Sequence, residues 1–242
     1  MKFQLLLFVF ALNLGGGLVR AQVECVFLPT EQEDKSPELL EKHLEFEKLW
    51  QLGANDESQR RAVEFIPVVI HIIHDQGIGD ISDAQVLKAI DFLNQGFSNQ
   101  GEYYHKAGTP VEIQFCLAEQ DPQGQPTSGI TRTNSSLSTL IAEEQDAKLK
   151  NLIHWDASCY ANVYIVNEII SSISGRGVLG YANGPMLHGS PLDGLVVESA
   201  LTGRNPENTS TLIHEMGHYL GLLHTFEGGC KNDDCMVDGD KV

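Results

Sequence analysis

Three histidines lie close together in the segment T-L-I-H-E-M-G-H-Y-L-G-L-L-H-T-F, residues 211–226. His214 and His218 are four residues apart, so on a helix their rings lie on one side, one turn from each other. That spacing lets both rings reach a single zinc ion at about 2.0–2.1 Å. Gly221 can leave the helix without steric cost and bring His224 back as a third ligand. Three neutral imidazoles leave one position of a tetrahedral zinc open, as in catalytic sites.

Glu215 directly follows the first of these histidines, so we expect its carboxylate beside the ion and not bonded to it. Zinc lowers the pKa of bound water from about 15.7 towards about 7. Glu215 can then accept the proton as a general base and pass it to a leaving amine. The chemistry predicted is hydrolysis of a peptide bond. In the alternative interpretation the histidines only pack, but Glu215 would then be buried among apolar neighbours without a partner, which is costly.

The same segment predicts the helix that must hold these side chains. Thr209 or Ser210 can cap its N-terminus. A buried face is expected from residues at helical spacing: Leu212, Met216, Leu220 and Leu223.

The preceding residues predict a mixed sheet with helices on it. Apolar, β-branched runs predict strands at residues 65–74, 111–118, 162–170 and 194–198. Residues 81–97 predict a helix, with a capping box from Ser82 and Gln85, and one apolar face: Val86, Ile90, Leu93 and Phe97. The turn-rich residues 121–129 predict a loop. This order favours an α+β (α/β-like) class, with helices packed on one twisted sheet.

Two histidines on the first predicted strand, His71 and His74, are three residues apart. Side chains at that spacing point to opposite faces of a strand, so the two rings do not readily share one ion. We therefore expect both to be structural.

Charge and composition exclude several classes of partner. The chain has 242 residues and a formal net charge of −17, which argues against nucleic acid and against docking on anionic lipid. Residues 1–21 have one positive charge, an apolar core and small residues before Gln22, the layout of a secretory signal peptide. The apolar run is short for a membrane anchor. We expect a secreted protein.

Residues 22–61 are acidic and contain one short amphipathic helix pattern, which cannot form a core alone. We interpret them as a pro-segment, with an ordinary N-terminal extension as the alternative, and residues 62–242 as the main domain. Asn134 and Asn208 begin glycosylation sequons. The five cysteines suit an oxidising location, and their odd number leaves at least one without an internal partner. Cys116 can pair with Cys159, and Cys230 with Cys235 or with a residue beyond the end.

The segment H-E-M-G-H-Y-L-G-L-L-H is similar to the extended zinc signature of the metzincin metallopeptidases. Within that clan, G-H-Y-L-G-L-L-H-T-F-E-G-G-C resembles the pappalysin family, the group of pregnancy-associated plasma protein A. Further segments over residues 62–242 resemble the family in the same order, among them F-I-P-V-V-I-H-I-I-H and L-G-Y-A-N-G-P. The resemblance implies a secreted zinc metalloendopeptidase acting on proteins or peptides, with a metzincin catalytic domain split by a cleft over one zinc ion. His214, His218 and His224 would be its ligands and Glu215 its base.

The resemblance also implies features outside the zinc motif. Residues 180–182 correspond to an edge strand that borders the substrate in relatives; an ordinary loop is the alternative. Family members often bind calcium after the third histidine, where acidic residues supply oxygen ligands; a solvated acidic loop is the alternative. Those residues are Asp233, Asp234, Asp238 and Asp240. Cys25 corresponds to a thiolate that keeps some relatives latent as zymogens by occupying the open zinc position; a disulfide or a bystander thiol is the alternative.

The sequence departs from the metzincin pattern after His224. Metzincins carry a methionine-containing turn well downstream of the third histidine, whereas this chain ends eighteen residues later and Met236 lies too close. We therefore expect a catalytic domain that is incomplete at its C-terminus, with the lower subdomain largely missing. A secreted binding protein that retains the zinc motif without catalysis is the alternative function.

Overall fold

The computed structural model describes residues 63–173 and 177–224, together with the single residues 41 and 48. The predicted signal peptide, nearly all of the predicted pro-segment and everything after His224 lie outside the described residues.

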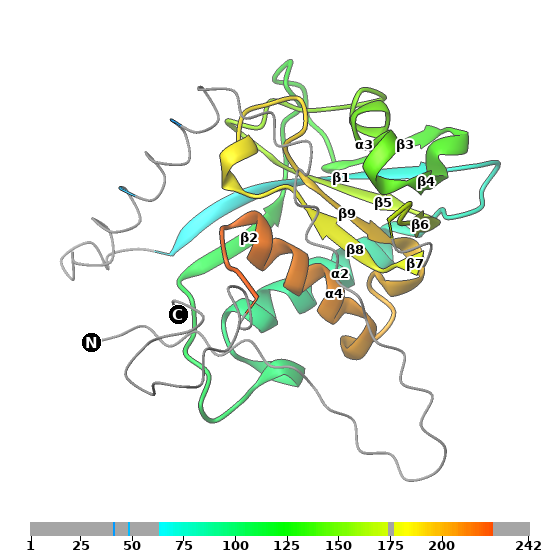
Figure 1. The fold of residues 1–242 in the computed structure, drawn as a ribbon. Helices are drawn as coiled ribbons and strands as arrows, with labels where there is room; N and C mark the ends of the chain where they lie inside the picture. Colours follow the sequence, from blue (N-terminus) through cyan, green and yellow to red (C-terminus); the bar gives the residue numbers. More distant parts are fainter. Residues whose placement is uncertain (1–40, 42–47, 49–62, 174–176, 225–242) are drawn as a thin grey trace, which may run out of the picture.

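Within the described residues, six strands form one main sheet (Figure 1). Its central strand, β1 (Glu64–His74), pairs in parallel with β2 (Ile113–Leu117) and β3 (Ile130–Asn134) along its two halves, and with β5 (Ala161–Val166). Beyond β5 come β9 (Leu195–Glu198), parallel to β5, and β8 (Gly180–Ala182), antiparallel to β9. All six residues of β5 are buried, as expected for a parallel strand covered on both faces.

A second, three-stranded sheet is formed by β4 (Thr139–Ile141), β6 (Glu168–Ile170) and β7 (Gly177–Val178). The apolar run at residues 162–170, predicted as one strand, is therefore two strands in two sheets. Asn167, between them, donates its backbone N–H to the Ser138 carbonyl at 2.7 Å, at the point where the chain changes sheets.

Helices cover the main sheet on both faces (Figure 1). On one face, α2 (Asp83–Phe97) and α4 (Pro206–Tyr219) pack beside each other and share a core with alternate residues of β1, β5 and β9. On the other face, α3 (Ala142–Lys150) covers a second core, which includes Tyr164 and Tyr181. Short 3-10 turns complete the described chain: Gly101–Tyr103, Ser136–Ser138, Pro185–Leu187 and Ser199–Leu201.

The predicted capping box of α2 is confirmed. The Ser82 hydroxyl accepts from the Gln85 N–H, and the Gln85 side chain accepts from the Ser82 N–H, each at 3.3 Å. The predicted apolar face of this helix is buried in the core that it shares with α4. The predicted α+β class, a mixed sheet with packed helices and an active-site helix, is likewise confirmed.

Candidate metal centre

Helix α4 carries the first two histidines, and it begins earlier than the sequence pattern indicated. Asn205 is its N-cap, accepting from the Asn208 N–H at 2.8 Å, and Pro206 occupies the first turn. The prediction of a cap at Thr209 or Ser210 is therefore wrong. Thr209 lies inside the helix, buried, and its hydroxyl donates to the Asn205 carbonyl at 2.8 Å.

Two of the four residues predicted to form the buried face of α4 are fully buried. Leu212 and Met216 are buried in the core shared with α2, and Leu220 packs partly against it. Leu223 is 45% exposed, so its assignment to the buried face is wrong. It lies beyond the end of the helix, where the 3.6-residue period no longer applies.

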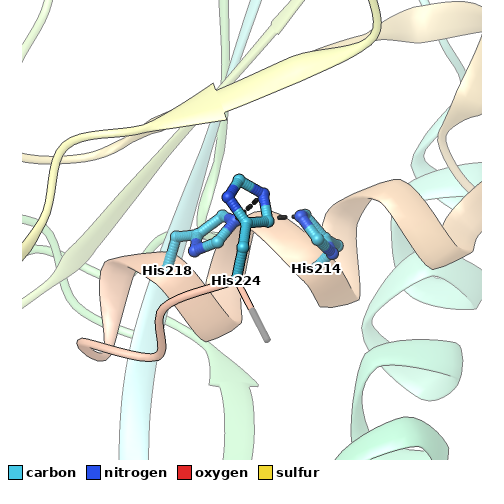
Figure 2. A group of neighbouring side chains, drawn as sticks. All are labelled: His214, His218 and His224. Carbon is cyan, nitrogen blue, oxygen red and sulfur yellow. Dashed lines mark hydrogen bonds between the residues drawn. The ribbon is translucent and has the colours of Figure 1, made fainter. Parts of the chain in front are cut away.

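The chain leaves α4 at Gly221, as predicted. This residue has φ +96°, a left-handed conformation that glycine adopts without strain. Its N–H donates to the His218 carbonyl at 2.9 Å, and the Leu222 N–H donates to the Gly217 carbonyl at 2.9 Å. This turn reverses the chain and returns His224 to the side of the helix that carries His214 (Figure 2).

The three imidazoles converge (Figure 2). The His218 Nε2 atom lies 2.9 Å from the Nε2 atom of His214 and 3.1 Å from that of His224. Two nitrogens of a tetrahedral zinc site, each about 2.0–2.1 Å from the ion, are about 3.3–3.4 Å apart. The donor atoms therefore stand close to the separation that one zinc ion requires.

The protonation state of two of these rings suits metal binding, because a neutral imidazole has a lone pair to donate. The His218 Nδ1 atom lies 2.7 Å from the Leu222 carbonyl, which only accepts, so this nitrogen carries the proton. In the neutral ring, the Nε2 lone pair then faces the other two histidines, and the carbonyl fixes the ring orientation. Burial, followed by the neighbouring His218 and His224, lowers the pKa of His214 to about 4, so this ring is neutral near pH 7.

Glu215 is fully buried and lies against the edge strand β8. A Cβ atom at Gly180 would stand 2.9 Å from Glu215 Cγ and 3.1 Å from both Thr211 Cγ2 and the Val196 carbonyl oxygen. Only glycine allows β8 to approach α4 this closely. Among the described strands, β8 pairs with β9 alone, so its prediction as an edge strand is confirmed.

The two histidines on β1, His71 and His74, are structural residues, as predicted. The His71 ring is fully buried on the face away from α4, where it contacts Tyr164. It hydrogen-bonds Thr131 at 2.7 Å and Asn162 at 2.9 Å, and burial lowers its pKa to about 4. The partly exposed His74 accepts from the Gly77 N–H at 3.2 Å. Neither belongs to the histidine group of the metal centre.

The cysteine predictions are tested only in part. Cys116 and Cys159 are free thiols in the described structure, so the pairing considered between them does not form. Cys25, Cys230 and Cys235 lie outside the described residues, as do the four aspartates of the predicted calcium segment.

Sequence reasoning missed a buried polar cluster behind β8, formed by Asp146, Lys150, Tyr181 and Asn183. The only sign of it in the sequence is the four-residue spacing of Asp146 and Lys150, which on most helices marks an exposed ion pair. Within the described part of the chain, no helix has the length and apolar character needed to span a bilayer.

Comparison with known proteins agrees with this arrangement. The family model described as pregnancy-associated plasma protein-A matches residues 143–242. An extracellular metalloprotease of Arthroderma otae is 27% identical, over 97% of this chain and 77% of its own length. The chain spans 55% of the length of a second one, from Arthroderma gypseum, at 28% identity. Pappalysin-1 of Mus musculus is 32% identical over 88 residues, which are 36% of this chain and 5% of that protein.

Solved structures extend the similarity to the fold. Tannerella forsythia mature mirolysin, in complex with a cleaved peptide, is 31% identical, with a TM-score of 0.60 over 71% of this chain and 69% of that one. A promirolysin variant from the same organism is 29% identical, with a TM-score of 0.65 over 83% and 69%. The fold is metzincin-like, three imidazoles converge, and the matched family model and relatives agree. The chain therefore belongs to the pappalysin family of zinc metallopeptidases.

Proposed function

We propose that this protein is a secreted zinc-dependent endopeptidase that cleaves peptide bonds within protein substrates. One observation carries the proposal: three imidazole nitrogens converge on one point, at the helix that also carries the buried Glu215. His214, His218 and His224 would hold one zinc ion through nitrogen, the donor that zinc sites use most often together with thiolate.

Zinc, when bound, supplies Lewis-acid chemistry: it polarises a carbonyl and lowers the pKa of water. The remaining steps belong to Glu215. Its carboxylate accepts the proton of the attacking water and later gives it to the leaving nitrogen of the peptide. Burial of Glu215, a residue of α4, against β8 holds the carboxylate in one place and limits access of bulk water to it.

The edge strand β8 gives the substrate a place to bind. A peptide in extended conformation can add to an open sheet edge through main-chain hydrogen bonds. Because Gly180 lies against Glu215, a peptide paired with β8 would run past the base. This arrangement favours cleavage in the interior of a chain over removal of terminal residues.

Secretion and the division of the chain belong to the same proposal. Residues 1–21 would be a signal peptide, residues 22–61 a pro-segment and residues 62–242 the catalytic domain. The names of the extracellular relatives support secretion. Latency through Cys25 and calcium binding at Asp233, Asp234, Asp238 and Asp240 remain predictions.

The decisive experiment replaces the base and keeps the metal ligands. We expect Glu215→Gln to retain one zinc per chain and to lower cleavage of casein by about 10²–10⁴-fold, because general base catalysis contributes that much. Zinc is measured by elemental analysis, and cleavage of long internally quenched peptides is compared with cleavage of short free-ended ones. Glu207→Gln, at an exposed site in the first turn of the same helix, is the matched control and should cleave normally.

The alternative, a binding protein without catalysis, predicts a different result. The wild-type protein would then hold zinc but cleave none of these substrates, and Glu215→Gln would change nothing. Equal cleavage by the wild type and Glu215→Gln would remove Glu215 from the mechanism.

A further inference from the structure

An ion pair between a fully buried lysine and a largely buried aspartate lies behind the edge strand, on the face of the main sheet opposite to the metal centre. Lys150, the last residue of α3, is 0% exposed. Its ammonium group lies 3.0 Å from Asp146 Oδ1 and donates to the Leu192 carbonyl at 2.7 Å. A lysine is almost never fully buried unless it is paired in this way.

The carboxylate of Asp146 also binds the edge strand. The Tyr181 hydroxyl, from the middle of β8, donates to Asp146 Oδ1 at 2.8 Å. Asn183, just after β8, donates its side-chain amide to Asp146 Oδ2 at 3.1 Å and also to the Leu192 carbonyl. One carboxylate therefore joins α3 to β8 and, through Lys150 and Leu192, to the segment that leads back into β9.

The alternation of side chains along β8 connects this network to the metal centre. Tyr181 points into the core beneath α3, whereas Gly180 and Ala182 point to the opposite face. There Gly180 lies against Glu215 and Ala182 joins the core beneath α4. The network therefore holds β8 from one face of the sheet, and Glu215 contacts the same strand from the other face.

The network is better suited to holding β8 in one position than to raising the stability of the fold. Replacement of a buried ion pair by packed apolar residues is often neutral or stabilising, so its presence is weak evidence for a stabilising role. Directional bonds to one carboxylate instead specify where β8 lies along and across α3. β8 is only three residues long and has one partner strand among those described, so its own ladder fixes it weakly.

We propose that Asp146, Lys150 and Tyr181 are positioning residues, which hold β8 so that a peptide paired with its open edge lies in register with Glu215. This inference rests on the proposed function. It concerns binding of the extended substrate chain and leaves zinc binding and proton transfer to the residues described above.

The test removes one hydroxyl in the full-length secreted protein. Tyr181→Phe deletes the bond from β8 to Asp146 and keeps the ring. Tyr164→Phe is the matched control, because Tyr164 is equally buried in the same core. Its hydroxyl donates to the Ile153 carbonyl at 3.0 Å and lies 3.0 Å from His154 Nδ1, with no hydrogen bond to β8 or Asp146 among the described residues. Asn183→Ala, which removes the other bond between this segment and Asp146, is the second variant should Tyr181→Phe not fold.

We expect Tyr181→Phe to lower kcat/KM for long peptides by about tenfold, the loss typical of a hydrogen bond to a charged group. The loss should shrink for short peptides that barely reach β8. Zinc content and the affinity for acetohydroxamate, a small probe that chelates the metal, should stay unchanged. Tyr164→Phe should leave the dependence on peptide length as in the wild type. Equal losses in the two variants at every peptide length would overturn the proposal.

A readout without catalysis separates this inference from the proposed function. We expect Tyr181→Phe, in contrast to Tyr164→Phe, to speed amide hydrogen exchange in residues 180–183. When it is added to the Glu215→Gln variant, Tyr181→Phe should also weaken binding of a long uncleaved peptide by about tenfold. If the wild type cleaves nothing but these changes occur, the function fails and the positioning role stands. If exchange and peptide binding do not differ between the two variants, the positioning role fails.

Discussion

The imidazoles of His71 and His214 are neutral near pH 7 for the same physical reason. Desolvation is the main cause that lowers the pKa of both His71 and His214 to about 4. For His71, the neutral ring is also fully hydrogen-bonded: Nε2 donates to the Asn162 side-chain oxygen at 2.9 Å and Nδ1 accepts from the Thr131 hydroxyl at 2.7 Å. Desolvation thus keeps His71 neutral as a hydrogen-bonded residue of the core, and it leaves His214 with a lone pair that can bind a metal.

The lowered pKa of His71 predicts acid sensitivity. Between pH 6.5 and about pH 4 the unfolded chain binds a proton at this ring that the folded chain does not. The free energy of unfolding should therefore fall as pH falls through this window, by at most about 3 kcal/mol from this residue. Urea unfolding of the wild type and His71→Gln at several pH values measures the effect, and the variant should have the flatter pH dependence.

The control for this experiment is His74→Gln, on the same strand at a partly exposed site. It should keep the slope of the wild type. An equally steep slope in His71→Gln would show that the acid sensitivity has another source.

At the scale of elements, the contact between β8 and α4 decides where Glu215 stands. An added methyl group at Gly180 would meet Glu215 Cγ, Thr211 Cγ2 and the Val196 carbonyl, all within 3.1 Å. We expect Gly180→Ala to displace Glu215 and to reduce peptide cleavage by more than about tenfold, since small misplacements of a catalytic group are costly. Zinc content should not change.

The matched control for Gly180→Ala is Gly177→Ala on β7. There the nearest atom to an added Cβ is the Ile169 carbonyl oxygen at 3.9 Å, an ordinary contact. Cleavage by this variant should equal that of the wild type. Normal cleavage by Gly180→Ala would mean that the two elements can separate without cost to the site.

Elements with strong local patterns could be predicted from the sequence. The β-branched run of β1 and the capped, amphipathic α2 are examples. The polar β3, I-T-R-T-N, was not predicted, because it is held by backbone pairing to β1 and not by a buried face of its own. Helix α3, A-E-E-Q-D-A-K-L-K, has no apolar stripe, and its buried residues include Lys150.

At the scale of the whole molecule, the metal centre could be predicted because its residues lie within eleven positions of the sequence. The helix period and one glycine turn bring His214, His218 and His224 together without help from distant segments. The network behind β8 could not be predicted in this way. Tyr181 lies 35 residues from Asp146 in the sequence, and Leu192 lies 42 residues from Lys150. Only the order of strands in the sheet brings these residues together.

The central claim is that one zinc ion is bound by three histidines beside Glu215. Its most direct test is an anomalous difference map of the crystallised full-length protein, recorded on both sides of the zinc absorption edge. The account predicts a single strong peak about 2.0–2.1 Å from the Nε2 atoms of His214, His218 and His224. A zinc peak at any other residues, or rings turned away from one another with no peak between them, would contradict it.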